Sequence, residues 1–538
     1  MSNISKVQTL KELIGKGESQ FNQEIAFLYR RKKEYKEVTY HKLHDDINGF
    51  GTYLYELGIK EKKVAVIGEN SYEWLVGFFS VANSSNIIVP IDKELDAVTI
   101  YELIQKSNCS VVLYTKSYKN KIRRLMELND SIIEEYICLN HMDEYVVTGE
   151  QQIQQGKTEF LLEEVKPDDD AAIYFTSGTT GKAKGVLLSH RNLCEDMYGA
   201  AQRIQPQKSI FLILPLNHTF ALTASVLCVL IGGKEIYICS GIKSFFRDLQ
   251  ELKPSGLVVV PLFVENIYKT ILNKITEDGK QKSYKLLCKF NGLLLKCGID
   301  RRKKLFHTIV DSLGGKLDFI VCGGAPINAV LIEEFSKWGI DIYNGYGITE
   351  CSPIISVNSQ EENRLGSVGK PLEGVKVRID SPDEAGRGEI CISGQTVMRE
   401  YYKESEQTAQ TIIDGWYHTG DIGYLDEEGY LFVTGRIKNL IILANGENIT
   451  PELLEDKIKT YRLVDEVIVY GKDDKIVAEI YPDIEYAKMH QIKDIEEDLN
   501  EFITKLNKSL PTYQRIKSVV IREEEFEKNT NRKIIRKY

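Results

Sequence analysis

The sequence lacks the positive charge that nucleic-acid-binding proteins carry. Its 538 residues include 69 lysines and arginines against 78 aspartates and glutamates, which gives a formal net charge of −9. Binding to a polyanion ordinarily needs an excess or a cluster of positive charge. Because 43% of the residues are hydrophobic and 27% charged, the composition is that of an ordinary globular protein. We expect no nucleic-acid partner.

Signals for export and for membrane insertion are also missing. The first 18 residues contain no apolar segment of the signal-peptide type. The apolar run IFLILPLNHTFALTASVLCVLIGG (210–233) is long enough to span a bilayer, but Pro215, Asn217 and His218 interrupt it. We therefore expect a buried strand, a turn and a buried helix there, in a cytoplasmic protein.

The ten cysteines contain no C-x-x-C pair. Several of them lie in apolar runs, where a free cysteine behaves as a small hydrophobic residue. This usage favours a reducing compartment and argues against a structural zinc site.

The stretch YFTSGTTGKAKGV (174–186) concentrates hydroxyl groups, glycines and lysines in one short run. Its glycines let the backbone approach a ligand, and its N–H groups, hydroxyls and lysines can bind several anionic oxygens. It is not a Walker loop, because Gly178 and Gly181 are too close together and Ala183 follows Lys182. The chain also lacks the G-x-S-x-G elbow of a serine hydrolase. The run predicts a loop that holds an oligophosphate.

The pattern of apolar and turn-forming residues changes twice along the chain. Apolar runs such as KVAVI, SVVLYT and DFIVC alternate with amphipathic helical segments through roughly the first three hundred residues, which predicts parallel sheets covered by helices. From about residue 365, GVKVRI, GEICISG and GYLFVTG predict an antiparallel sheet or small barrel. The segment 437–538 has strands and helices of its own, which predicts a small separate domain.

Four further stretches make the phosphate loop specific: NGYGITE (344–350), WYHTGD (416–421), GRIKNLIILANGENITPELLED (435–456) and the terminal EKNTNRKIIRKY (527–538). In this order, and together with 174–186, they resemble the adenylate-forming superfamily of acyl-CoA synthetases, adenylation domains and luciferases. The resemblance covers nearly all of the chain, and it extends to the bacterial long-chain fatty-acid:CoA ligases.

This resemblance implies an α/β fold in two parts. A large N-terminal body over residues 1–436 would hold two parallel or mixed α/β sheets and a small antiparallel β-barrel. A small mobile α+β domain would follow over residues 437–538. Lys438 matches the hinge position, and Gly446 and Glu447 would line a channel for CoA.

The implied reaction uses ATP to activate a carboxylic acid as an acyl-adenylate, which then passes its acyl group to a thiol. Thr349, Glu350 and Lys533 match the catalytic positions, and Glu350 would also hold Mg²⁺. Tyr346 would lie against the adenine, and Asp421 would accept the ribose hydroxyls. The ATP- and AMP-binding residues that the resemblance implies are Thr176, Ser177, Gly178, Thr179, Thr180, Gly181, Lys184, Gly324, Ala325, Asn344, Gly345, Tyr346, Asp421 and Arg436.

The acid and its acceptor are less specified by sequence. Relatives that activate amino acids carry an Asp just after the PLNHTF-like strand, whereas this chain has FALTASVL there, which favours an apolar acid. His218, Phe220, Phe263 and Gly323 are the candidate acyl-pocket residues, although each could equally be plain core. CoA is the expected acceptor. Loading of an acyl carrier protein is the alternative, and a non-catalytic adenylate-binding regulator is disfavoured because the catalytic positions are intact.

The segment 280–304 carries nine lysines and arginines against one aspartate, with apolar residues at helical spacing. We favour a helix that packs on the body and leaves its basic face in solvent. Peripheral contact with an anionic membrane is the alternative.

Overall fold

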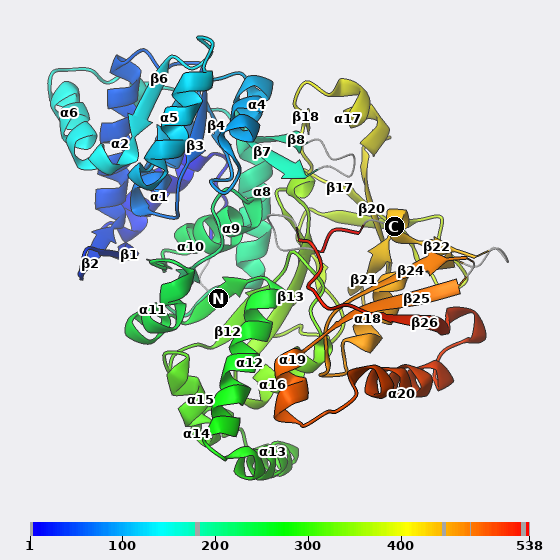
Figure 1. Ribbon diagram of the computed structural model, residues 1–538. Helices are drawn as coiled ribbons and strands as arrows, with labels where there is room; N and C mark the ends of the chain where they lie inside the picture. Colours follow the sequence, from blue (N-terminus) through cyan, green and yellow to red (C-terminus); the bar gives the residue numbers. More distant parts are fainter. Residues whose placement is uncertain (1–3, 178–182, 444–447, 474, 529–533, 537–538) are drawn as a thin grey trace.

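The computed structural model describes residues 4–177, 183–443, 448–473, 475–528 and 534–536. Two large sheets and their helices form the N-terminal body, and the C-terminal part, orange to red in Figure 1, packs beside it. The predicted fold class is confirmed, with parallel sheets first, then an antiparallel sheet, then a small α+β unit. The boundary predicted at residues 436 and 437 stays a prediction.

The first sheet has nine strands in the order β15-β14-β13-β12-β11-β9-β10-β1-β2. Its middle strands run parallel, while β2, β14 and β15 at the edges run antiparallel to their neighbours. The strands are β1 (Ile25–Arg31), β2 (Glu34–Thr39), β9 (Ser209–Leu212), β10 (Glu235–Ile238), β11 (Gly256–Val259), β12 (Phe319–Cys322), β13 (Asp341–Gly347), β14 (Ile354–Val357) and β15 (Lys370–Pro371).

The second sheet has seven strands in the order β18-β8-β7-β4-β3-β5-β6. The first two pairings in this order, β18 with β8 and β8 with β7, are antiparallel, so the two arms of the predicted phosphate loop are neighbouring strands. The strands are β3 (Lys63–Ile67), β4 (Ile87–Pro90), β5 (Cys109–Tyr114), β6 (Glu135–Cys138), β7 (Asp170–Ser177), β8 (Ala183–Ser189) and β18 (Glu400–Tyr401).

One large hydrophobic core joins the two sheets. It combines residues of both sheets with helices α1 (Leu10–Phe21), α2 (Tyr40–Glu56), α3 (Tyr72–Ala82), α8 (His190–Arg203) and α10 (Cys228–Ile231). A second core lies between the first sheet and helices α11 (Phe245–Leu252), α12 (Pro261–Glu277), α15 (His307–Ser312) and α16 (Ala329–Lys337). A third covers the second sheet with α4 (Ala97–Ser107) and α5 (Lys119–Leu128).

The antiparallel sheet follows the body in sequence. Its strands are β16 (Lys376–Asp380), β17 (Gly388–Ser393), β19 (Ile412–Ile413), β20 (Trp416–Leu425) and β21 (Leu431–Arg436), and α17 (Ser405–Thr411) precedes β19. The remaining helices of the body are α6 (Met142–Gln154), α7 (Glu159–Leu162), α9 (Thr219–Leu222), α13 (Gln281–Lys296) and α14 (Arg302–Leu305).

The C-terminal part has a separate core built from residues between Ile441 and Ile521. It contains β22 (Ile441–Ile442), β23 (Asn448–Ile449), β24 (Val464–Lys472), β25 (Lys475–Pro482) and β26 (Ile516–Ile521), with α18 (Pro451–Ile458), α19 (Ile484–Met489) and α20 (Ile495–Lys508).

The interrupted apolar run at 210–233 folds as the sequence predicts. It forms β9, the short helix α9, a π-helical turn (Thr223–Leu227) and α10, all in the core. Every helix in the described part of the chain is too short or too polar to span a bilayer.

Candidate active site

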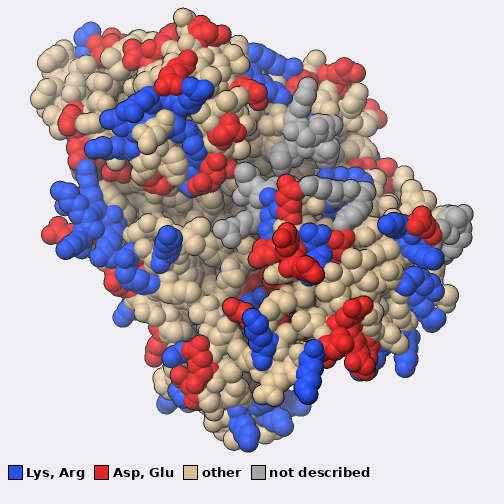
Figure 2. All heavy atoms as spheres, viewed as in Figure 1, with Lys and Arg blue, Asp and Glu red and all other residues tan. Residues whose placement is uncertain are grey.

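A cleft of about 3760 Å³ runs from the ends of the body's strands to the C-terminal part. The predicted residues that line it are Thr176, Lys184, His218, Phe220, Phe263, Gly324, Ala325, Asn344, Gly345, Tyr346, Thr349, Glu350, Asp421, Arg436 and Lys438. Residues that are far apart in sequence therefore line one large cleft, although their individual roles stay predictions. Lysines and arginines mix with acidic residues over the face in Figure 2, so no single sign of charge dominates it.

A bulge in β20 presents Asp421 to this cleft. The three residues Thr419–Asp421 face the single residue Ile390 of β17. Glu389 holds the bulge from the side, because its Oε1 accepts a hydrogen bond from the backbone N–H of Gly420 at 2.9 Å. Gly420 has φ +69°, a conformation that a residue with a side chain adopts only with strain. Bulges of this kind redirect side chains next to binding sites.

Asp421 is only 3% exposed and already has two partners. Tyr346 Oη donates to its Oδ2 at 2.6 Å, and Arg436 Nε lies 2.7 Å from its Oδ1. Burial, and then the Asp421 carboxylate, raise the pKa of the Tyr346 phenol, so Tyr346 remains a donor at neutral pH. A carboxylate has about four acceptor positions, so Asp421 can still accept the two hydroxyls of a ribose.

Glu350 lies in a short turn (Thr349–Cys351) that follows β13, four residues after Tyr346 of that strand. Its Oε1 accepts a hydrogen bond from Tyr401 Oη at 2.9 Å, and Tyr401 Oη lies 3.2 Å from Tyr417 Oη. Burial and the Glu350 charge raise the pKa of Tyr401. Lys184 Nζ lies 4.8 Å from the centre of the Tyr401 ring, a cation–π distance. Tyr401 thus connects Glu350 to the strand that follows the phosphate loop.

Several predicted nucleotide-binding residues lie at strand ends. Ser177 ends β7 and Gly345 lies on β13, while Gly324, with φ +82°, follows β12. The Asn344 side chain donates to the Ser367 carbonyl at 3.2 Å, so it also fixes a neighbouring loop. The predicted residues that lie outside the described part of the chain are Gly178, Thr179, Thr180, Gly181, Gly446, Glu447 and Lys533.

The candidate acyl-pocket residues form an apolar wall. A Cβ added to Gly323 would lie 3.1 Å from Phe220 Cζ, so the Phe220 ring lies directly against this glycine. Gly323 itself is behind the ring, and Phe220, Phe263 and His218 line the cleft. Phe263 continues the wall into the second core, where its ring centre is 6.0 Å from that of Phe245.

Lys438 lies between the body and the C-terminal part, in the turn Ile437–Asn439. Burial, and then the neighbouring Arg436, lower the pKa of its ammonium group.

The C-terminal part meets α12 through polar pairs. Lys269 Nζ is 2.6 Å from Asp465 Oδ1, and Arg462 donates to Tyr268 Oη at 2.8 Å.

Sequence reasoning missed the residues behind the site. Tyr401, Tyr417 and Glu389 position Glu350 and the bulge, yet none of them stands out by type or spacing. Tyr401 lies 51 residues from Glu350 in sequence, and the pairing of β18 with β8 brings it back to the cleft.

Family comparison agrees with this geometry. The model of the AMP-binding enzyme family matches residues 17–402, and that of the AMP-binding enzyme C-terminal domain matches residues 438–538. The chain belongs to the AMP-binding enzyme family. It is 28% identical over 462 residues to a long-chain-fatty-acid–CoA ligase of Mycobacterium bovis, a match that covers 81% of this chain and 75% of the relative. It is 26% identical over 551 residues to human long-chain-fatty-acid–CoA ligase 1, covering 91% and 78%.

Solved structures share the fold of this family member. A fatty acyl CoA synthetase of Mycobacterium tuberculosis superposes with a TM-score of 0.69 at 21% identity, covering 98% of this chain and 97% of the other. The o-succinylbenzoate CoA synthetase of Bacillus subtilis, solved with an acyl-adenylate, superposes with a TM-score of 0.73 at 21% identity, covering 97% and 96%.

We predict that Asp421→Asn weakens binding of AMP about 10- to 100-fold, because hydrogen bonds to a charged group are worth about 1.5–3 kcal/mol. Isothermal titration calorimetry with AMP measures the effect. Asp380→Asn is the matched control: this partly exposed carboxyl lies on β16 of the same sheet and pairs with Arg378, and the variant should bind AMP as the unchanged protein does. Equal AMP affinity in both variants would show that Asp421 does not hold the nucleotide.

Proposed function

We propose that this AMP-forming acid–thiol ligase activates a medium- or long-chain fatty acid and transfers it to CoA. The observation that carries the proposal is the shared cleft, which holds Glu350, the Asp421–Tyr346–Arg436 cluster and Lys184 beside an apolar wall. The nucleotide side and the apolar side meet at Thr349, whose Oγ1 lies 3.4 Å from Thr219 Oγ1, next to Phe220.

The first step forms one bond and breaks one. An oxygen of the acid's carboxylate attacks the α-phosphorus of ATP, the bond to the bridging oxygen breaks, and pyrophosphate leaves with that electron pair. Catalysis of phosphoryl-type transfer is mostly positioning and electrostatic stabilisation. Asp421 and Tyr346 would position the nucleoside, while Thr176 and Lys184 would contact the outer phosphates. Lys533, outside the described residues, would neutralise the carboxylate and α-phosphate.

Glu350 is the residue that fits a magnesium ion. It is a carboxylate that lines the cleft near Lys184, and Mg²⁺ prefers hard oxygen ligands. When bound, the ion would supply positive charge for the phosphate oxygens. Tyr401 donates a hydrogen bond to Glu350 Oε1 and so restricts the orientation of this carboxylate.

The second step transfers the acyl group. The CoA thiolate attacks the acyl carbon, and AMP leaves with the electrons of the acyl–oxygen bond. We propose that Lys438 is the pivot about which the C-terminal part turns between the two steps, with Gly446 and Glu447 in the CoA channel.

The choice of a fatty acid rests on the apolar wall and on relatives. The segment from Thr219 to Ile231, which follows His218 in sequence, contains no charged side chain that could hold an amino acid's ammonium group. The curated relatives described above are named as long-chain-fatty-acid–CoA ligases. Loading of an acyl carrier protein is the alternative, and it differs only in the acceptor.

We predict sustained pyrophosphate release from MgATP that depends on CoA and peaks at a medium or long acid, in a series from acetate to stearate. A single stoichiometric burst that is indifferent to CoA would instead assign the acyl group to a carrier protein. If none of the acids in the series supported pyrophosphate release, the proposed function would be contradicted.

We predict that Gly323→Ala shifts the preferred acid to a shorter chain. The new Cβ would lie 3.1 Å from Phe220 Cζ and force this ring toward the cleft. The kcat/KM for the longest good substrate should fall about 10-fold, since one methylene of pocket space is worth about 1–3 kcal/mol. Gly292→Ala is the control, because a Cβ there meets nothing within 4 Å. An unchanged chain-length profile would remove Phe220 from the acyl pocket.

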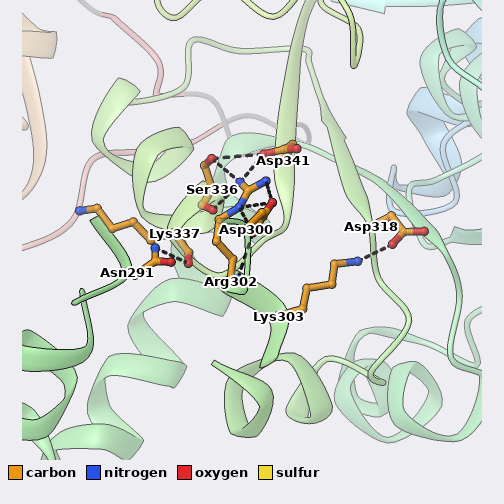
Figure 3. Close-up of polar contacts among 8 residues, drawn as sticks. All are labelled: Asn291, Asp300, Arg302, Lys303, Asp318, Ser336, Lys337 and Asp341. Carbon is orange, nitrogen blue, oxygen red and sulfur yellow. Dashed lines mark hydrogen bonds and ion pairs between the residues drawn. The ribbon is translucent and has the colours of Figure 1, made fainter. Parts of the chain in front are cut away.

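We also propose that α13 contacts an anionic membrane surface from which the fatty acid comes. The inner side of α13 is fixed on the body: Asn291 donates to the Lys337 carbonyl at 3.4 Å, and nearby Arg302 donates to the Ser336 carbonyl at 2.9 Å (Figure 3). The favoured packed helix is therefore present, with its lysines in solvent.

The outer side of α13 carries apolar as well as basic residues. Leu286, Phe290 and Leu293 are 69%, 49% and 62% exposed, and they occupy one side of the helix at intervals of four and three residues. Lys282 and Lys289 lie on the same side. Basic side chains are visible at the lower end of the molecule in Figure 2, where Figure 1 places α13. Apolar residues among lysines suit the boundary between acyl chains and anionic headgroups.

Co-sedimentation with vesicles tests this contact. The protein should bind phosphatidylglycerol-containing vesicles better than pure phosphatidylcholine, and Lys282→Glu with Lys289→Glu should abolish the difference. The same reversal at Lys505 and Lys508, exposed lysines of α20, should leave binding unchanged. Equal binding by both double variants would exclude α13 as the docking surface.

A further inference from the structure

Three side chains with different metal-binding atoms meet at the foot of the β20 bulge. Glu389 and Cys391 are two residues apart on β17 and so share one face of the sheet, and His418 of β20 lies directly opposite Cys391. His418 Nδ1 is 2.8 Å from Glu389 Oε2 and 3.4 Å from Cys391 Sγ. The ligand atoms of these three described side chains all lie within 4.8 Å of one another.

The spacing of these atoms fits a tetrahedral ion. Zinc lies about 2.3 Å from a cysteine sulfur and about 2.0–2.2 Å from histidine nitrogen or carboxylate oxygen, which places tetrahedral ligands roughly 3.3–3.6 Å apart. The sulfur–nitrogen distance of 3.4 Å already falls in this range. The shorter nitrogen–oxygen distance is that of a hydrogen bond, and it needs to open by about half an ångström to admit the ion.

We propose that Glu389, Cys391 and His418 bind one thiophilic divalent cation, of which Zn²⁺ is the best match. A thiolate, an imidazole and a carboxylate together select zinc over magnesium, which prefers oxygen ligands alone. Glu389 and His418 line the cleft while Cys391 is buried behind them, so the fourth position of the ion opens toward the cleft. This site is separate from the magnesium position at Glu350.

Binding of the ion releases one proton. The Cys391 thiol loses its proton to solvent and becomes a thiolate, which donates an electron pair to the metal. Neutral His418 coordinates through Nδ1 and carries its proton on Nε2, so the imidazole contributes no net proton. Glu389 coordinates through a carboxylate oxygen.

The ion would act on the nucleotide site through the bulge. Glu389 Oε1 accepts from the Gly420 N–H, which leaves Oε2 as the atom that faces His418. A metal at this point would therefore tie β17 and β20 together on either side of the residues that present Asp421. The lack of a C-x-x-C pair does not bear on this site, because its ligands come from two strands.

Cobalt substitution of the full-length protein tests the proposal without an activity assay. Co²⁺ should bind one ion per chain with release of one proton and produce the near-ultraviolet absorption of a cobalt–thiolate bond. Zn²⁺ should then displace the cobalt and remove this absorption without further proton release. Cys391→Ser should remove this absorption, whereas Cys297→Ser, at an exposed cysteine that follows α13, should retain it.

His418→Asn keeps the thiol and provides a second variant. It should weaken Zn²⁺ binding by more than about 100-fold, since even residues that only support a metal ligand contribute about 10- to 100-fold. Thermal unfolding of each variant verifies that it is folded. Absence of the thiolate absorption in the unchanged protein, or its persistence in Cys391→Ser, would overturn the proposal and leave a Glu389–His418 hydrogen bond beside a buried thiol.

Discussion

The nucleotide side of the cleft depends on one irregularity in an otherwise regular strand, the bulge of β20. In a regular antiparallel pair, successive side chains alternate between faces and the register stays constant. The bulge breaks this register, and Glu389 holds the displaced backbone by accepting from Gly420. The Asp421 carboxylate can then accept a hydrogen bond from Tyr346 of the nine-stranded sheet and pair with Arg436 of β21. One buried carboxylate thus joins two sheets, and its partner Arg436 is the last residue before the predicted domain boundary.

The contact between the body and the C-terminal part that is formed at α12 is polar, unlike the hydrophobic cores within each part. The C-terminal part has its own hydrophobic core, and it meets α12 through ion pairs and hydrogen bonds such as Lys269 with Asp465 and Arg462 with Tyr268. Ion pairs at protein surfaces are typically worth about 0–1 kcal/mol each, far less than a continuous hydrophobic core. A polar contact of this kind suits the pivot that we propose at Lys438.

The sequence predicts the parts of this architecture that are local. Strand and helix patterns identify the fold class, and the motifs around Tyr346, Glu350 and Asp421 identify residues that the structure brings into one cleft. Pairing between distant segments cannot be read in this way. Tyr401 reaches Glu350 because β18 pairs with β8, and Cys391 meets His418 because β17 pairs with β20. Helical periodicity likewise predicts α13 but not which side faces the body, since Asn291 turns inward and Leu286 outward.

The nucleotide wall and the apolar wall of the cleft are built from different structural elements. Substitutions in the two walls therefore have different consequences for the fold. The nucleotide wall is made of strand ends, turns and a bulge that are bonded into two sheets, so a substitution there disturbs several elements at once. The apolar wall comes from Phe220 in a short helix and Phe263 at the start of α12, and their rings rest on Gly323 and Phe245 through van der Waals contacts. Such side chains can be exchanged without altering backbone hydrogen bonds. A lineage with this fold can therefore diversify its acids while its use of ATP is conserved.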